Sequence, residues 1–159
     1  MILIITGVAG AGKTTVGKIL AKKLGWKFYD ADDFHPKENI EKMRSGISLT
    51  DQDRRPWLEA LRLLIDEETG SAVLACSALK QSYRDYLKEG RKDVEFVFLK
   101  GDKTLIRKRL EERKGHYAGA DLLEGQLSAL EEPKDVLTED ISPDSEAIAD
   151  DIIRELKLT

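Results

Sequence analysis

Glycine, lysine and threonine residues near the N-terminus have the types and spacing of a phosphate-binding loop. Residues 7–14 read Gly-Val-Ala-Gly-Ala-Gly-Lys-Thr, which fits the pattern G-x-x-x-x-G-K-[ST]. They directly follow an apolar run at residues 2–5 and precede residues 16–24, where apolar side chains recur at helical spacing. Glycines let backbone N–H groups converge on phosphate oxygens, and the start of a helix favours negative charge. The sequence therefore predicts a binding site for a nucleoside triphosphate.

We expect the side chains of this loop to bind different parts of the nucleotide. Lys13 reaches the β and γ phosphates, and Thr14 places its hydroxyl on Mg²⁺. Lys13 is therefore also a predicted catalytic residue. In this segment the predicted nucleotide-binding residues are Gly7, Gly10, Ala11, Gly12, Lys13, Thr14 and Thr15.

An acidic run after the second apolar segment can supply the carboxylate that a magnesium site needs. Residues 30–36 read Asp-Ala-Asp-Asp-Phe-His-Pro, and residues just past a parallel strand line the ligand crevice of such sheets. Asp30 and Asp32 are two residues apart, so we expect both to face the same side of an extended segment. We assign Asp30 to the metal ion with Thr14, and Asp32 to the hydroxyl proton removed during phosphoryl transfer. The two carboxylates could exchange roles, and a helix-capping turn is the alternative.

His35, in the same run, has two interpretations. A neutral imidazole can hydrogen-bond a polyol or a carboxylate substrate, whereas a histidine before a proline often bonds only the local backbone. His116 is the only other histidine, and the spacing of the two does not suit zinc.

The apolar pattern alternates short strands with helices along the chain. We expect strands at residues 2–5, 26–29, 72–75, 94–99 and, more weakly, 136–138. We expect helices at residues 16–24, 37–45, 80–88 and 102–114, and also after Thr50 and from Pro143. The spacing of Thr50 and Asp53 predicts a capping box. Strands separated by helices of this size imply an α/β protein with a parallel sheet and helices on both faces.

The composition indicates one soluble globular domain over residues 1–159. Hydrophobic residues make up 41% of the chain and charged residues 35%, with a net charge of −4. That balance argues against broad nucleic-acid binding through phosphate contacts. No apolar run approaches the roughly 20 residues of a membrane span. The single cysteine, Cys76, excludes an internal disulfide framework, so we expect a cytoplasmic protein.

Beyond these motifs, the sequence resembles the small P-loop gluconokinases. The shared segments begin with residues 30–36, Asn39-Ile40-x-Lys42-Met43-x-x-Gly46 and Leu49-Thr50-Asp51-x-Asp53-Arg54-x-Pro56-Trp57-Leu58. They continue with residues 75–80, Tyr83-Arg84-Asp85, residues 113–117, Leu122-Leu123, Gln126, Leu130-Glu131 and Pro133. The resemblance extends from about residue 2 to residue 155.

This resemblance implies ATP-dependent phosphorylation of D-gluconate on its 6-hydroxyl, giving 6-phospho-D-gluconate and ADP. It implies a three-layer fold similar to shikimate and nucleoside monophosphate kinases, with a five-stranded parallel sheet. A mobile helical lid is expected near residues 113–130, and an acceptor-binding region near residues 30–58. Homodimers occur in the family, so a homodimer is possible here.

Gluconate is an anion, so its carboxylate needs cationic partners. Arg54 and Arg84 can each offer a guanidinium fork, and Lys80 a point charge. The alternatives are an ion pair of Arg54 with a neighbouring aspartate and a similar surface pair for Arg84. Ser77 can contact substrate or cap a helix. The predicted substrate-binding residues are Asp32, His35, Arg54, Ser77, Lys80, Arg84 and His116.

Basic residues are concentrated in residues 102–114. A lid that closes over ATP excludes water from the reaction. By resemblance to similar kinases, Arg109 stacks on adenine and Arg113 approaches the transferring phosphate as a catalytic residue. His116 either contacts substrate or packs in the lid, and a solvated helix face is the alternative for the whole segment.

The sequence departs from the family pattern at a few positions, and other interpretations compete with it. Gly125 stands where a serine is more usual, and Ala9 and Ala11 replace frequent serines of the loop. A shikimate kinase is disfavoured because residues 76–78 lack the expected glycine run. A nucleotide-binding regulator without turnover and a nucleic-acid kinase are the remaining alternatives.

Overall fold

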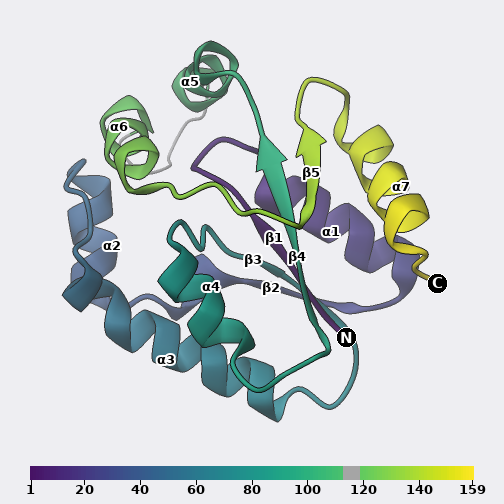
Figure 1. Ribbon diagram of the computed structural model, residues 1–159. Coiled ribbons are helices and arrows are strands. Elements are labelled where there is room, and N and C mark those ends of the chain that lie inside the picture. The colour runs from purple at the N-terminus through teal and green to yellow at the C-terminus, as the bar shows by residue number, and fades with distance from the viewer. Residues whose placement is uncertain (113–118) are drawn as a thin grey trace.

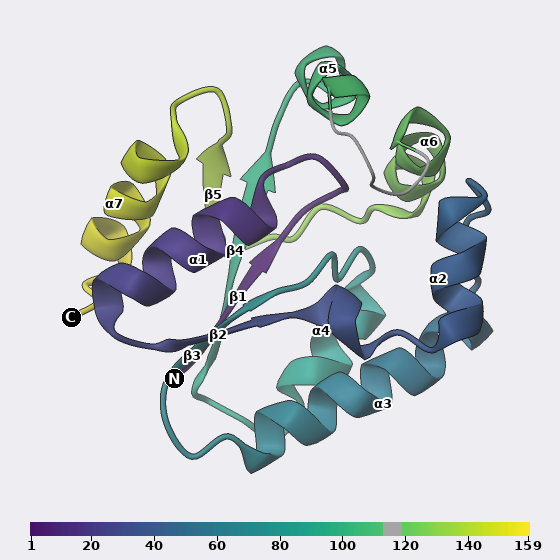
Figure 2. The ribbon, with the colours of Figure 1, turned by 180° about the vertical axis from the view of Figure 1, so that it is seen from behind.

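The computed structural model describes residues 1–112 and 119–159 and has an α/β architecture. Five parallel strands form one sheet in the order β2-β3-β1-β4-β5. Helices α1 and α7 cover one face and α3 and α4 the other (Figure 1), which Figure 2 shows from behind. The predicted layers and parallel sheet are confirmed.

The strands are short and the helices connect them in sequence. The strands are β1 (Ile2–Thr6), β2 (Lys27–Asp30), β3 (Ala72–Ala75), β4 (Val94–Lys100) and β5 (Leu137–Asp140). The α-helices are α1 (Lys13–Leu24), α2 (Lys37–Arg44), α3 (Asp51–Glu67), α4 (Gln81–Lys88), α5 (Lys103–Glu112), α6 (Gly119–Ala129) and α7 (Ser145–Leu156). A short 3₁₀ helix, η1 (Ala31–Phe34), follows β2.

Strand β1 lies in the middle of the sheet and is buried throughout. Successive side chains of a strand point to opposite faces. Leu3 and Ile5 accordingly belong to the core beneath α1 and α7, whereas Ile2 and Ile4 belong to the core beneath α3 and α4. A continuous apolar run is therefore what a central parallel strand requires. Because the chain builds the sheet on both sides of β1, the loop after β1 opens at a crevice between its neighbours.

The start of α3 agrees with the sequence pattern, whereas the start of the last helix and the segment after β2 differ. The Thr50–Asp53 capping box is present, with both reciprocal hydrogen bonds formed. The last helix begins at Ser145 rather than at Pro143, because the carboxylate of Asp144 accepts from the N–H of Ala147 and caps it. The segment after β2 is also not extended, since residues 31–34 form η1.

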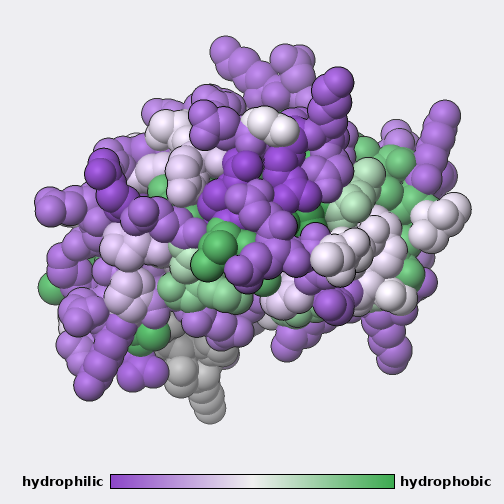
Figure 3. All heavy atoms as spheres, turned by 90° about the horizontal axis from the view of Figure 1, so that it is seen from below, coloured by the Kyte–Doolittle hydropathy of each residue, from purple (hydrophilic) through white to green (hydrophobic). Residues whose placement is uncertain are grey.

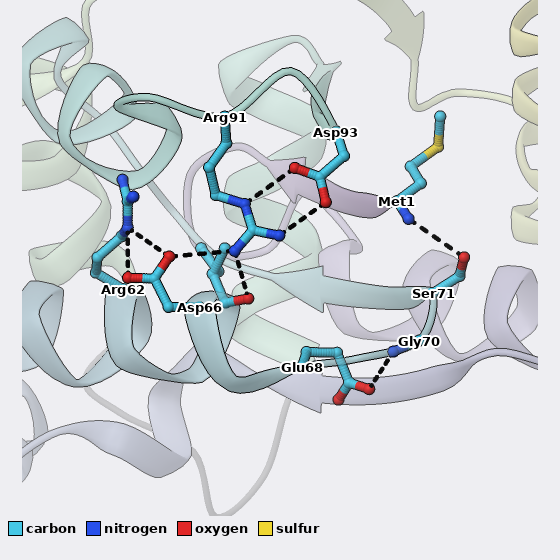
Figure 4. A network of polar contacts seen from close by, with 9 residues as sticks. Met1, Arg62, Asp66, Glu68, Gly70, Ser71, Arg91 and Asp93 are labelled. Atoms are coloured by element: carbon cyan, nitrogen blue, oxygen red, sulfur yellow. Dashed lines mark hydrogen bonds and ion pairs between the residues drawn. The ribbon is translucent and has the colours of Figure 1, made fainter.

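The end of the sheet opposite the loop after β1 is closed by polar contacts. Arg91 donates to both carboxylate oxygens of Asp93, to the carbonyl oxygen of Ile65 and to Asp66, which also binds Arg62 (Figure 4). Seen from below Figure 1, this side is mostly hydrophilic, with only scattered apolar residues (Figure 3). These contacts fix α3 to the start of β4. In the described part of the chain, no helix is both long and apolar enough to span a membrane.

Candidate active site

The loop at residues 7–12 turns sharply between β1 and α1. Gly10 and Gly12 have positive φ angles of 84° and 96°, a left-handed conformation that favours glycine. A Cβ atom on Gly10 would lie 2.8 Å from Cγ of Leu110, so α5 can pack against the loop only because this side chain is missing. Gly12 precedes α1, and no described side chain caps the helix. The first N–H groups of α1 are therefore oriented as an anion site needs.

The other predicted nucleotide-binding residues occupy this loop or the first turn of α1. Nζ of Lys13 donates to the carbonyl oxygen of Val8 over 2.9 Å, so the ammonium lies back over the loop. Ala11 is buried and its N–H donates to Val8, which makes it a packing residue of the turn. The side chain of Thr15 is exposed on α1. The structure thus brings the predicted residues together at one helix N-terminus.

Thr14 and Asp30 meet across the ends of α1 and β2. The Thr14 hydroxyl donates to Oδ2 of Asp30 over 3.0 Å. The second oxygen of Asp30 accepts from the backbone N–H of Asp32, also over 3.0 Å, which caps η1. A hydroxyl oxygen and a carboxylate oxygen side by side are ligands that Mg²⁺ prefers. These two residues therefore fit the predicted metal-side pair.

Asp32 lies on η1 and is largely exposed. We expected Asp30 and Asp32 to lie on one extended segment. That expectation is wrong, because the chain forms a 3₁₀ turn directly after Asp30. The two carboxylates nevertheless stay near one point. Burial raises the pKa of the Cys76 thiol to about 12, and Lys13, Asp32 and Asp30 all act on that thiol electrostatically. The hydrogen bonds of Asp30 with the Thr14 hydroxyl and with the N–H of Asp32 keep both acids beside the start of α1.

A cavity of about 570 Å³ opens between α3 and α6 and is called the α3–α6 cavity below. It is lined by Ser48, Leu49, Thr50, Asp51, Arg54, Lys80, Gly125, Ser128, Ala129 and Glu131. Arg54 also lines a smaller space, the inner cavity, together with Ser77 and Gln126. Arg54 therefore lies between the α3–α6 cavity and the residues that follow β3.

Arg54 is buried to 8% exposure, and among the described residues its side-chain hydrogen bond goes to a tyrosine. Its Nη1 donates to the hydroxyl of Tyr83 over 3.1 Å, and its guanidinium lies over the Tyr83 ring, 5.6 Å from the centroid. The neighbouring aspartates instead bind lysines: Asp51 binds Lys80 and Asp53 binds Lys42. The alternative of a surface ion pair between Arg54 and a neighbouring aspartate is therefore not supported, and substrate binding by Arg54 stays a prediction.

Lys80 and Asp51 line the α3–α6 cavity, and Tyr83 joins them in a polar cluster. Nζ of Lys80 lies 2.8 Å from Oδ1 of Asp51, and the Tyr83 hydroxyl donates to the same oxygen. Hydrogen bonds from Lys80 and Tyr83 lower the pKa of Asp51. Lys80 is thus already partly neutralised, whereas Arg54 supplies the less compensated positive charge.

His35 packs beside this cluster in its neutral form. Its ring stacks on Trp57 with a 4.5 Å centroid separation, and Nδ1 lies 3.2 Å from the amide nitrogen of Asn39. Burial, together with the charge of Arg54, lowers the pKa of His35 to about 4. Trp57 is almost fully buried and donates from its indole nitrogen to the carbonyl oxygen of Ala31, which secures η1. His35 therefore supports the site as a neutral ring.

Arg84 is buried to 3% exposure, and most of its donors are engaged with the protein. Nη1 donates to the carbonyl oxygen of Ala78 over 2.7 Å, and Nη2 to that of Glu131 over 2.7 Å. Only Nε lacks a partner among the described residues. Ala78 itself has a φ of 38°, a strained conformation for a residue with a side chain. Arg84 thus holds the turn after β3, and a contact with substrate stays a prediction.

The remaining predicted residues divide between described and undescribed parts of the chain. Arg109 lies on α5 and donates to the carbonyl oxygen of Ile141 over 2.8 Å, beside the turn after β5. Ser77 lines the inner cavity. Arg113 and His116 lie outside the described residues, as does the first part of the predicted lid.

Two contacts at this site were not predicted from the sequence. Oε1 of Gln126 accepts from the N–H of Ala9 over 2.6 Å, and Tyr83 joins Arg54 to Asp51. Both residues stood out only as part of the family resemblance, and no local spacing indicates their partners.

Among the described residues, no group of three or more histidine, cysteine or acidic side chains could hold a metal ion.

Comparisons with known proteins agree with this geometry. A family model described as shikimate kinase matches residues 9–157. A probable gluconokinase from Xenopus tropicalis is 48% identical over 151 residues, covering 84% of this chain and 80% of that protein. The thermoresistant gluconokinase of Escherichia coli K12 is 40% identical, covering 98% and 93%. A crystal structure of a gluconokinase from Sinorhizobium meliloti superposes with a TM-score of 0.89, at 38% identity and 98% and 90% coverage.

Proposed function

Because the chain belongs to the gluconokinases, within the family that the shikimate kinase model describes, we propose that it transfers the γ-phosphoryl group of ATP to the 6-hydroxyl of D-gluconate. The products are 6-phospho-D-gluconate and ADP. Two observations carry the proposal. Thr14 at the start of α1 donates to Asp30, which also accepts from the N–H of Asp32. The buried Arg54 lines the inner cavity together with Gln126, whose side chain binds Ala9 of the phosphate-binding loop.

On the nucleotide side, the N-terminus of α1 and the loop at residues 7–12 hold the phosphates. The first N–H groups of α1 favour an anion, because Gly12 at the N-cap has no side chain that could accept from them. Lys13 leaves the carbonyl oxygen of Val8 and moves to the phosphates when these are bound. Its charge then stabilises the negative charge that develops during in-line transfer.

Thr14 and Asp30 fit a magnesium site. Their oxygens already lie 3.0 Å apart, and both are hard oxygen ligands. When bound, Mg²⁺ neutralises charge on the phosphate oxygens. The two hydrogen bonds of Asp30, to Thr14 and to the N–H of Asp32, favour the metal side for Asp30.

Asp32 is then the residue that accepts the proton of the attacking hydroxyl. Its side chain is exposed at the end of β2, and it acts electrostatically on the same thiol as Lys13. A general base of this kind typically contributes a factor of roughly 10² to 10⁴ in rate. Transfer between two bound substrates needs no covalent enzyme intermediate, and the protonated thiol of Cys76 is not required as a nucleophile.

On the acceptor side, Arg54 binds the carboxylate of gluconate. It is buried and already oriented by Tyr83, so little conformational freedom is lost on binding. Lys80, Ser77 and the neutral His35 are candidates for the hydroxyl groups of the acceptor. A planar guanidinium in a buried position suits a carboxylate better than a neutral sugar, which would leave the charge unpaired.

The experiment is ADP release from Mg-ATP with D-gluconate, D-glucose, shikimate, related sugar acids and no acceptor. We expect strong turnover with gluconate, and only background turnover with glucose, which has the hydroxyls but no carboxylate. Preferred turnover with shikimate would keep a kinase and replace the acceptor. Tight ATP binding with no turnover on any acceptor would instead indicate a regulator that senses nucleotide.

Other features that the sequence or the family resemblance implies stay predictions. These are a lid near residues 113–130, adenine stacking by Arg109, phosphate contact by Arg113, acceptor contact by His116 and a single domain over residues 1–159. A homodimer and a cytoplasmic location are also predictions. Light scattering tests the homodimer, and cell fractionation tests the location.

A further inference from the structure

Gln126 connects helix α6 to the phosphate-binding loop. Its Oε1 accepts a 2.6 Å hydrogen bond from the backbone N–H of Ala9, 117 residues away in sequence. Ala9 directly precedes Gly10, whose left-handed conformation shapes the loop. We propose that Gln126 is a positioning residue of the phosphoryl-transfer site, which aligns the loop with the bound acceptor. This inference rests on the proposed kinase function.

Helix α6 is itself fixed to the elements that line the α3–α6 cavity. Leu122 packs with Met43 and Leu49 in a small buried cluster, against which Ala9 also lies. A Cβ atom on Gly125 would lie 1.8 Å from Oγ of Ser48, so the glycine allows α6 to approach the segment before α3 closely. The position of Gln126 therefore depends on the elements around the acceptor as well as on the loop.

The end of α6 is also attached to the turn after β3. The N–H of Glu131 donates to the carbonyl oxygen of Leu79 over 2.8 Å, and Oε1 of Glu131 accepts from the N–H of Gln81 over 2.8 Å. That turn carries Ser77, which lines the inner cavity. A displacement of this turn or of α6 is thus transmitted to the Ala9 contact through a short, packed segment.

The second end of the Gln126 carboxamide can act on substrate. Gln126 lines the inner cavity together with Arg54 and Ser77, and this space of about 20 Å³ has room for one small polar group rather than for a whole sugar acid. A glutamine side chain has an acceptor oxygen and an amide nitrogen with two donors. Because the oxygen is engaged by Ala9, the nitrogen is the group that can donate to an acceptor hydroxyl or a phosphoryl oxygen. One planar group would then contact both the loop and the reacting groups.

This arrangement predicts an effect on alignment rather than on binding alone. A misplacement of about 1 Å at a reacting centre can cost roughly a hundredfold in rate. Without the Gln126 contact, the loop still binds nucleotide, but the γ-phosphoryl group is less well aligned with the acceptor hydroxyl. Water then competes with the acceptor, and ADP forms without a matching amount of sugar phosphate.

Two substitutions separate the two ends of the carboxamide. Gln126→Met keeps the length of the side chain and removes both polar groups. Gln126→Glu keeps an oxygen for Ala9 and removes the amide donors. Glu124→Gln is the matched control, because it also changes a polar side chain of α6. The Glu124 side chain binds Lys103 and Arg107 on α5.

Kinetics with D-gluconate should show kcat lowered by about tenfold or more in both Gln126 variants, with the KM for ATP changed by less than about threefold in Gln126→Met. The ratio of ADP to phosphorylated product should rise above one in Gln126→Met and stay at one in Glu124→Gln. A general loss of stability would lower the amount of active enzyme and would leave this ratio at one.

Hydrogen exchange of the Ala9 amide, followed by its NMR resonance in the ligand-free protein, tests the Ala9 contact independently of the kinetics. We expect its exchange protection to be lost in Gln126→Met and kept in Gln126→Glu. Unprotected Ala9 in the wild type, or variant kcat and product ratios within twofold of the wild type, would overturn this inference alone. A wild type that phosphorylates none of the acceptors would overturn the proposed function, and this inference with it.

Discussion

The hydroxyl of Thr14 donates to Oδ2 of Asp30 over 3.0 Å, which joins the first turn of α1 to the end of β2. A helix-start hydroxyl and a strand-end carboxylate are thereby preset as neighbouring oxygen ligands. The same carboxylate caps η1, so the position of Asp32 depends on it as well. Strand β3, which lies next to β1, ends at Ala75 and is followed by Cys76 and Ser77 rather than by an acidic residue. Asp30 at the end of β2 therefore supplies the carboxylate beside the phosphate-binding loop.

Thr14→Ala should lower kcat by about a hundredfold or more, because it removes a metal ligand and the partner of Asp30. Thr14→Ser keeps the hydroxyl and should retain most of the activity. The measurement is kcat as a function of Mg²⁺ concentration. Equal activity of Thr14→Ala and the wild type at limiting Mg²⁺ would contradict the metal assignment.

Asp32→Asn should lower kcat by about 10² to 10⁴, because the amide cannot accept the hydroxyl proton. Protein stability should change little, since the side chain is exposed. Asp33→Asn is the matched control, because Asp33 is also exposed on η1. The test is the kcat of both variants with their thermal unfolding. The assignment fails if Asp33→Asn is impaired more than Asp32→Asn.

Arg54→Ala should raise the KM for gluconate by about a hundredfold, because it leaves the acceptor carboxylate without its buried partner. The KM for ATP should change far less. Arg55→Ala is the control, because Arg55 is the exposed neighbour and does not line the α3–α6 cavity. Tyr83→Phe, which releases the Arg54 guanidinium, should give an intermediate increase. Equal effects of Arg54→Ala on both KM values would argue against carboxylate recognition.

The neutral state of His35 predicts a pH dependence of stability. Its pKa is about 4 in the folded protein and 6.5 in the unfolded chain, so the unfolded chain binds the proton more strongly. The free energy of unfolding should therefore fall as the pH falls from about 6.5 to about 4, by at most about 3 kcal/mol from this residue. His35→Phe keeps a ring over Trp57 and should flatten that part of the curve.

The check is chemical denaturation of the wild type and His35→Phe between pH 4 and pH 7. Asp53, whose backbone contact with Thr50 and pairing with Lys42 lower its pKa to about 2, responds only at more acidic pH. An unchanged slope in His35→Phe would show that His35 is not held neutral.

Gly125→Ser should destabilise the contact between α6 and residue 48. A Cβ atom at position 125 meets Oγ of Ser48 at 1.8 Å and Cβ of Ser48 at 3.0 Å, so α6 or Ser48 must move. We expect a loss of about 1 kcal/mol in stability and a lower kcat. Adding Ser48→Gly removes both atoms and should restore the wild-type values. If the double variant stays less stable than the wild type, the destabilisation by Gly125→Ser does not come from a clash with Ser48.

The sequence predicted most of the architecture because the relevant signals are local. A continuous apolar run, a glycine-rich turn and a capping box each depend on residues close in the chain, and all three occur as expected at β1, residues 7–12 and α3. The prediction of an extended segment after Asp30 was wrong. The Asp30 carboxylate accepts from the N–H of Asp32, and this local hydrogen bond favours a turn over an extended conformation.

Site residues joined by long-range contacts were harder to predict. The pattern could mark Arg54 as cationic, but only the packing of α3 against α4 shows that Tyr83 orients it. Arg84 has the same charge and lies in a similar motif, yet backbone carbonyl groups from two loops engage it. Residue type thus predicts which groups can bind an anion, and tertiary packing decides which remain available for it.

The most direct test of the account is the identity and amount of product formed from Mg-ATP and D-gluconate. Phosphorus NMR of the reaction should show one phosphomonoester on the 6-position of gluconate for each ADP released. Arg54→Ala and Asp32→Asn should each reduce the rate of its formation. A phosphomonoester at another position, or ADP release without any sugar phosphate, would contradict the account.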